Sequence, residues 1–246
     1  MDLHLCGTEG KSSHPKRVFP PLYRSSGNVS EDRLAFFHVL ERLKAQKRTG
    51  WVDRGILRGT ALSEVNENIT EEDLFPSISD HMYRMALLAM CSLDASLDIT
   101  KCILMCLVHD LAEAQVGDIA PREGIPKEEK QRLEAEAMQN FVHVMLHSSP
   151  AALRIEALWK EYEEGQTAEA RFVKDLDRFE MASQALEYER RYEDKQLDAF
   201  FESSIPKLHH PEVQQWGVDL MQERETILQD RRNADNAADS SSNSPC

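Results

Sequence analysis

Apolar residues recur at intervals of three and four along most of the chain, which is the period of an amphipathic helix. The pattern predicts helices over about residues 30–43, 77–93, 100–115, 127–147, 151–163, 167–192 and 211–229. No strand-rich region and no repeat of fixed period interrupts this series. The pattern therefore predicts an all-α fold in one domain, spanning residues 29–229.

The first helix illustrates how the pattern is read. Ser30 is predicted to be its cap, with Glu31 and Asp32 favourably placed in the first turn, near the positive end of the helix. Its buried face is predicted to carry Leu34, Phe37, Leu40 and Leu43.

Three segments lack a helical period. Residues 1–28 are poor in acids and contain several serines, and residues 230–246 are rich in Asn, Asp and Ser. Both compositions predict disordered terminal segments. Between two helices, the pattern also fails from Gly50 to Phe75, which predicts a long loop.

The charge balance narrows the possible partners. A formal net charge of −14 argues against a polynucleotide, which would require a basic face. A small phosphorylated ligand stays possible, because a bound metal ion supplies local positive charge. The five cysteines have no paired spacing, and no apolar run is long enough for a membrane span or a secretory signal. We therefore expect a cytoplasmic protein, with the nucleus or an organelle left open.

The most informative polar interruption is the doublet His109-Asp110, which follows the apolar and thiol residues 102–108. Burying a histidine beside an aspartate costs free energy unless a partner such as a metal ion compensates. On a helix, Glu113 would share a face with His109, and Asp110 would lie about 100° around the axis. We expect the doublet to reach an ion, with Glu113 beside it as a general acid or base.

Two further polar residues lie next to apolar helix positions. His81 shares a face with Met85 and Leu88, and Asp177 follows Leu176. With the doublet they make a set of two histidines and two carboxylates from three helices. Such a set suits a divalent ion such as Mn, Co, Fe, Zn or Mg.

Each of these residues has a simpler interpretation when it is taken alone. A single histidine on an apolar face is usually a hydrogen-bonded core residue, and Asp177 lies in a charged stretch that could face solvent. Cys102 and Cys106 could join the doublet histidine in a thiolate site, although two thiols in an apolar helix are more often core. His143 and His147 are best explained as part of a polar helix face.

The order of these residues resembles a known family. Residues 79–85, 107–113 and 116–121, followed by Asp177, are similar to the motifs of the HD-domain phosphohydrolases. More narrowly, they resemble the eukaryotic HD-domain 5′-deoxynucleotidases. Supporting matches lie at residues 48–52, 125–130, 134–138, 158–163, 168–174 and 210–212. The resemblance covers nearly the whole helical part of the chain.

The resemblance implies an HD-domain helical bundle, usually a homodimer, that hydrolyses deoxynucleoside 5′-monophosphates to deoxynucleoside and phosphate. It implies that Mn²⁺, Co²⁺ or Mg²⁺ is bound by His81, His109, Asp110 and Asp177. Glu113 and Asp118 match the catalytic acids, and together with the Ile119 carbonyl they are candidates for holding a second ion. Trp51 matches an aromatic residue that crowds the sugar 2′ position and so favours deoxyribose.

The chemistry of phosphate monoester hydrolysis agrees with this set. The uncatalysed reaction is extremely slow, so it needs both charge neutralisation and an activated nucleophile. A divalent ion supplies both, because it polarises a phosphoryl oxygen and lowers the pKa of bound water from 15.7 toward about 7. Arg48 or Arg54 is a candidate for pairing with phosphate oxygens, with a solvated surface charge as the alternative.

One segment departs from the family pattern. Residues 57–75 are inserted between Trp51 and the His81 motif, and Phe75 and Pro76 lead into that motif without the Glu found in relatives. We expect a surface loop that affects substrate selection more than metal binding. Two alternatives stay open: an HD phosphohydrolase acting on nucleoside triphosphates or cyclic nucleotides, and a non-catalytic, metal-stabilised interaction module.

Overall fold

The computed structural model describes residues 17–46, 48–52, 77–120, 123–192 and 194–242. Within these ranges the secondary structure is helical and no strand is present, which confirms the predicted all-α fold. The insertion at residues 57–75 lies wholly outside the described residues, as does Arg54. The helices are α1 (Val29–Ala45), α2 (Thr49–Val52), α3 (Ile78–Met90), α4 (Ile99–Cys106), α5 (Glu113–Val116), α6 (Lys127–Gln139), the π-helix η3 (Asn140–Met145), α7 (Pro150–Glu164), α8 (Ala168–Arg191), α9 (Asp198–Ser204), the 3₁₀-helix η4 (Ile205–Lys207) and α10 (Pro211–Ser242).

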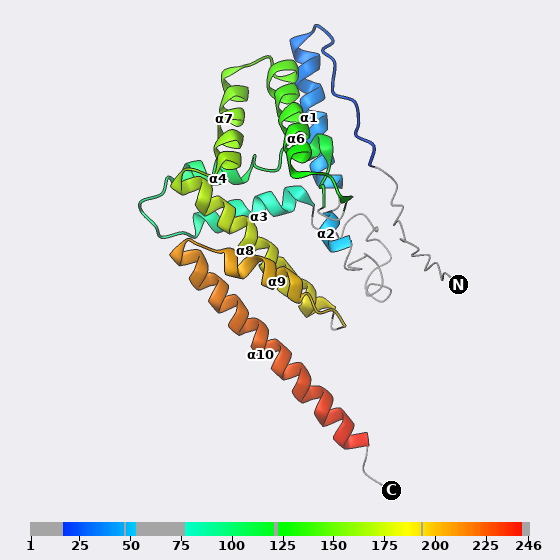
Figure 1. Ribbon diagram of the computed structural model, residues 1–246, viewed down its shortest axis with the longest axis vertical. Coiled ribbons are helices and arrows are strands. Elements are labelled where there is room, and N and C mark those ends of the chain that lie inside the picture. Colours follow the sequence, from blue (N-terminus) through cyan, green and yellow to red (C-terminus); the bar gives the residue numbers. More distant parts are fainter. Residues whose placement is uncertain (1–16, 47, 53–76, 121–122, 193, 243–246) are drawn as a thin grey trace, which may run out of the picture.

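Two hydrophobic clusters organise the helices. In Figure 1, α1, α6 and α7 gather at one end of the molecule and α8, α9 and α10 at the other, with α3 and α4 between them. One cluster surrounds α8 and includes Met85, Met105 and Leu176. The other lies among α1, α5, α6 and η3 and includes Phe36 and Phe141. Because α3 contributes to both clusters, its residue His81 lies where the two halves meet.

The start of α3 is fixed by its own sequence. The Ser77 hydroxyl accepts a hydrogen bond from the Asp80 N–H at 3.1 Å, and the Asp80 carboxylate accepts one from the Ser77 N–H at 2.9 Å. This reciprocal capping box agrees with the predicted start of the helix at about residue 77. It also sets the position of His81 one turn into α3.

Helix α1 differs from the prediction in its cap and in its buried face. Asn28 caps it instead of Ser30, and Leu34 and Phe37 are 52% and 51% exposed. The inner face carries Asp32, which is fully buried, together with Phe36, Val39 and Leu43. A charged residue on the inner face shifts the apparent apolar period. Its carboxylate is satisfied there by hydrogen bonds from Tyr23, Ser25, Ser26 and His147.

The helix predicted over residues 100–115 is interrupted at the doublet. Helix α4 ends at Cys106, and consecutive turns lead to α5. Several backbone hydrogen bonds here join residues three apart, including Glu113 N–H to the Asp110 carbonyl at 3.0 Å. With three residues per turn, side chains at i and i+3 eclipse each other. Asp110 and Glu113 therefore share a side of this segment, and the regular α-helical spacing predicted for His109 and Glu113 is wrong.

The ordered part of the chain extends beyond both predicted ends of the domain, residues 29 and 229. Residues 17–28 run extended beside α1, and the Tyr23 carbonyl accepts a hydrogen bond from Asn140 at 2.9 Å. Helix α10 continues past residue 229 to Ser242, and Arg231 donates to the Glu189 carbonyl along the way. Residues 1–16 and 243–246 lie outside the described residues. Among the described helices, none combines the length and the apolar character that crossing a membrane requires.

Candidate active site

The four residues predicted to bind a metal ion lie together. His81 comes from α3, His109 from the turns after α4, and Asp177 from α8, and their ligand atoms lie within 4.8 Å of one another. The Asp110 carboxylate lies 3.2 Å from His109 Nε2 and 3.9 Å from His81 Nε2. Segments far apart in the sequence therefore meet at one cluster, which we call the metal pole (His81, His109, Asp110 and Asp177).

The histidine rings are held in the orientation that metal binding needs. His109 Nδ1 bonds the Cys106 carbonyl at 2.9 Å, and His81 Nδ1 lies 2.5 Å from a Glu180 carboxylate oxygen. Metal-binding histidines use their second nitrogen in this way. The other nitrogen of His109, Nε2, is buried and makes no hydrogen bond. An imidazole nitrogen that faces the Asp110 carboxylate at 3.2 Å without a hydrogen bond to it fits a divalent cation, and this donor set suits a borderline or hard ion.

The electrostatics of the metal pole also favour a cation. Burial by itself would lower the pKa of His109, but the nearby Asp110 carboxylate raises it well above the ordinary value. Burial likewise opposes ionisation of Asp177, yet its hydrogen bond to His81 lowers its pKa overall. The Asp110 and Asp177 carboxylates thus stay ionised beside two buried histidines. Two ionised carboxylates this close together attract a cation, more strongly than in bulk water because the protein lowers the local dielectric constant.

Glu113 lies beside the metal pole, and its pKa is shifted in the opposite direction to those of Asp110 and Asp177. It is 7% exposed, and burial together with Asp110 and Asp118 raises its pKa well above the usual value. A carboxyl group with a raised pKa can exchange a proton near neutral pH. Two neighbouring carboxylates thus have opposite tendencies, because the Asp110 pKa is lowered by His109 against the effect of burial.

A cavity of about 680 Å³ opens from this cluster. Its volume falls in the range of about 300–1,000 Å³ typical of small-molecule sites. Trp51 is buried in its wall and stacks on Phe200, with ring centroids 4.1 Å apart and planes at 22°. The lining residues include the predicted positions Arg48, Trp51, Asp110, Glu113, Asp118, Ile119 and Asp177.

Arg48 supplies positive charge to this cavity. Burial disfavours its charged form, but Asp110, Glu180 and Asp177 outweigh that effect and raise its pKa. Its Nη1 atom is buried and makes no hydrogen bond. A guanidinium with a free donor suits the oxygens of a phosphate group.

Asp118 reaches the cavity from a tightly held loop. Its carboxylate accepts a hydrogen bond from the Thr49 N–H at 2.5 Å, and its carbonyl accepts one from the Thr49 hydroxyl at 2.9 Å. On the other side, Arg17 donates to the Asp118 carbonyl at 2.6 Å and forms two 2.6 Å bonds with Glu123. The N-terminal segment therefore fixes the loop that presents Asp118.

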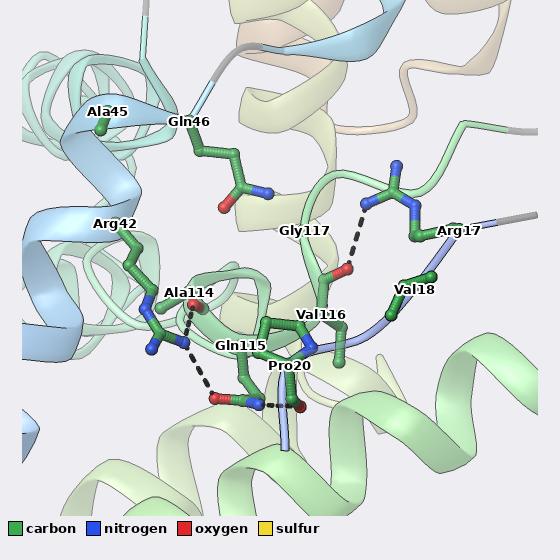
Figure 2. Close-up of a pocket in the computed structure, with 10 residues that line it drawn as sticks. All are labelled: Arg17, Val18, Pro20, Arg42, Ala45, Gln46, Ala114, Gln115, Val116 and Gly117. Carbon is green, nitrogen blue, oxygen red and sulfur yellow. Dashed lines mark hydrogen bonds between the residues drawn. The ribbon is translucent and has the colours of Figure 1, made fainter. Parts of the chain in front are cut away.

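Figure 2 shows the outer side of this loop, where Arg17 donates to the Val116 carbonyl at 3.1 Å. Gly117 has φ of 80°, and a Cβ atom there would collide with Arg17. The cavity of about 380 Å³ at this place has none of the predicted site residues in its lining. It is therefore separate from the candidate active site.

A smaller cavity of about 240 Å³ lies next to the same carboxylates. It shares Asp110, Glu113 and Asp177 with the larger cavity, and also Lys127 and Lys130. Its remaining wall comes from His109 and from α6 and α7. These three carboxylates, which we call the acidic cluster (Asp110, Glu113 and Asp177), thus lie between the two cavities.

Several residues that support the site were not predicted. Glu180 lies on α8 three residues after Asp177 and is 3% exposed, and the i,i+3 spacing is the sequence signal that puts the two carboxylates on one side of the helix. Tyr162 donates to Asp177 at 3.2 Å. Phe200 lies on the short helix α9, where no pattern in the sequence connects it with Trp51.

The alternative cysteine and histidine sites find no support among the described residues. Cys102 and Cys106 are fully buried in the core around α8, and burial raises the pKa of the Cys102 thiol to about 12. His143 bonds Ser148 at 2.8 Å, and His147 bonds Asp32 at 2.8 Å, so the two rings serve different partners.

The fold and the site together define the class of protein: a helical domain in which a His-Asp doublet is completed by a histidine and an aspartate from two other helices. The chain belongs to the HD-domain family, whose model matches residues 68–215. It is 42% identical over 206 residues to the human 5′-deoxynucleotidase HDDC2, covering 82% of this chain and 91% of the relative. It is 41% identical over 192 residues to the 5′-deoxynucleotidase hdd1 of Schizosaccharomyces pombe, covering 77% and 89%. The solved structure of the HD domain-containing protein YGK1 superposes with a TM-score of 0.56 and 30% identity, covering 80% of this chain and 87% of that one.

Proposed function

We propose that this protein is a metal-dependent 5′-deoxynucleotidase, which hydrolyses deoxynucleoside 5′-monophosphates to deoxynucleoside and inorganic phosphate. The observation that carries the proposal is a single cavity whose wall joins Asp110 and Asp177 of the His/Asp cluster to Arg48, with its unpartnered Nη1. The printed activity of the relatives supplies the substrate class.

In this proposal the metal pole holds one divalent ion, Mn²⁺, Co²⁺ or Mg²⁺. When bound, such an ion supplies Lewis acidity toward a phosphoryl oxygen and toward water. The chain supplies the ligands and their orientation, through the Cys106 carbonyl behind His109 and the Glu180 carboxylate behind His81. Glu113, Asp118 and the Ile119 carbonyl are the proposed ligands of a second ion.

The remaining residues have proposed roles toward the substrate. Glu113 exchanges the proton between the attacking water and the departing 5′ oxygen, for which its raised pKa is suited. Arg48 binds phosphate oxygens through its free Nη1 atom. Trp51, held in place by Phe200, crowds the sugar and favours deoxyribose. Arg54 lies outside the described residues and stays a sequence-based proposal.

A substrate panel tests the proposed activity. Purified protein is incubated with dAMP, dCMP, dGMP and dTMP and with their ribose counterparts, each with Mn²⁺, Co²⁺ or Mg²⁺, and phosphate release is measured. We expect hydrolysis of the deoxy series, slower hydrolysis of the ribo series, and loss of both on addition of a chelator.

The same panel separates the alternatives. Release of tripolyphosphate from dGTP, or opening of a cyclic nucleotide, without monophosphate cleavage would assign a different HD reaction. Stoichiometric metal in a folded protein with no hydrolysis of any substrate would favour an interaction module. The presence of both Glu113 and Asp118 in the cavity wall supports an enzyme, because a scaffold has no use for them.

We further propose a homodimer in the cytoplasm. An exposed apolar row on α3 is available for a second copy, with Tyr83 60%, Leu87 44% and Met90 62% exposed. The described cysteines are free thiols, as a reducing compartment maintains them. Light scattering of purified protein and imaging of a tagged full-length chain test these two points.

A further inference from the structure

The first turn of α6 carries two lysines, Lys127 and Lys130. Lys127 is its first residue and Lys130 its fourth. Positive charge near a helix N-terminus opposes the helix dipole, which favours acids there. The pair of Lys130 with Glu134, four residues on, offsets part of this cost within the helix, and both lysines also line the two cavities of the site.

Lys130 reaches the acidic cluster between the two cavities. Its Nζ atom lies 4.0 Å from a Glu113 oxygen and 3.4 Å from a Glu134 oxygen. Both distances exceed the ~2.7–2.9 Å of a charge-assisted hydrogen bond. An ammonium group has three donors, so Lys130 retains donors for a further oxygen. Lys130 lines both cavities, whereas Arg48 lines the larger one.

The charge of the site creates a need for this cation. A phosphate monoester carries about two negative charges and must approach Asp110, Glu113 and Asp177, which line both cavities. One divalent ion offsets only part of this repulsion. Burial disfavours the charged form of Lys130, but Glu134 and Glu113 raise its pKa overall, so the ammonium stays protonated.

We propose that Lys130 is a phosphate-binding residue of the active site, with Nζ donating to a non-bridging oxygen of the substrate phosphate. This inference rests on the proposed function for the identity of the substrate. Arg48 and Lys130 then hold the phosphate from two separate elements, one before α2 and one on α6. Binding phosphate also draws the ammonium away from Glu113, which leaves that carboxyl free for proton exchange.

The test measures the binding of inorganic phosphate to the metal-loaded full chain by titration calorimetry, without turnover. The variants are Lys130→Met, Lys130→Arg and, as a matched control, Arg132→Met, whose side chain lies on the exposed face of α6 and pairs with Glu129 and Glu136. We expect phosphate affinity to fall about 10-fold or more in Lys130→Met, the effect of one charge-assisted hydrogen bond. Lys130→Arg should retain most of the affinity, and Arg132→Met all of it.

Two results would overturn the inference. One is wild-type phosphate affinity in a folded Lys130→Met protein that has lost turnover, because Lys130 would then only position Glu113. The other is a wild-type protein that binds no phosphate when loaded with metal. Because binding is measured without hydrolysis, a protein that binds phosphate through Lys130 but hydrolyses no deoxynucleotide would defeat the proposed function and leave this inference supported.

Discussion

The two sides of the larger cavity are built in different ways. The metal pole comes from α3, α8 and the turns after α4, and its two histidine rings have second partners in the Cys106 carbonyl and in Glu180. Another part of its lining, which we call the nucleoside wall (Trp51 and Phe200), comes from the short helices α2 and α9. Its main internal contact is one stacked ring pair.

This difference indicates that the reaction requires the metal ligands to be fixed, whereas the wall that contacts the nucleoside can vary with the substrate. Ligands that share an ion must be placed accurately, so they are found on elements buried in the core. A wall that selects a sugar and base can be altered without losing the ion. We therefore expect changes at the metal pole to abolish activity and changes at the nucleoside wall to alter selectivity.

The largest effect is expected from removing a ligand of the metal pole. His109→Ala should lower kcat/KM by about 10³-fold or more, because it removes a ligand of the ion that stabilises the transition state. Metal content, measured by mass spectrometry, should fall in parallel. Full activity with normal metal content in this variant would show that the pole is not the metal site. His143→Ala, at a histidine outside the pole, is the control.

A smaller loss is expected from the residue behind His81. Glu180→Gln keeps the size of the side chain but removes the charge that orients the His81 ring. Such changes typically lower metal affinity by about 10–100-fold. A competition titration with a chelator measures this, and Glu187→Gln, at an exposed position on the same helix, should leave the affinity unchanged. An unchanged affinity in Glu180→Gln would argue against its supporting role.

The nucleoside wall should respond in selectivity. Phe200→Ala removes the ring on which Trp51 stacks, and such pairs contribute about 0.5–1.5 kcal/mol. The ratio of kcat/KM for dAMP over AMP should therefore fall about 2- to 10-fold, with metal affinity unchanged. Phe37→Ala, at a half-exposed position on α1, serves as control. A loss of metal binding in Phe200→Ala would break the separation between the two sides.

The smallest effect is expected from the N-terminal segment. Arg17→Ala releases the Asp118 carbonyl and Glu123, but the ion pair is partly exposed and so contributes modestly. We expect kcat to fall about 3-fold, and Arg24→Ala, an exposed arginine of the same segment, to have no effect. A loss as large as that of His109→Ala would instead make this segment part of the catalytic machinery.

The sequence was a better guide to the metal pole than to its surroundings. His81, His109 and Asp110 each lie next to apolar residues, a contrast that is visible without a structure, whereas Asp177 lies in a charged stretch and its assignment as a ligand depended on the resemblance. Polar residues on inner helix faces also led to wrong predictions. Because Asp32 is buried, the true buried face of α1 differs from the one that the apolar residues predicted. The turns at residues 107–112 were missed because their composition is that of a helix, and backbone bonds between residues three apart cannot be seen in the residue types. Phe200 and Lys130 depend on how distant helices pack, which no local pattern encodes.

The central claim is that Glu113 makes this metal site an enzyme, and one variant tests it most directly. Glu113→Gln removes the proton-exchanging carboxyl and keeps its shape. Hydrolysis of dAMP and metal content are measured on the same preparation. The account predicts that kcat falls at least about 100-fold, as expected for the loss of a general acid or base, with wild-type metal content at the His/Asp cluster. Near wild-type turnover with metal bound would contradict it.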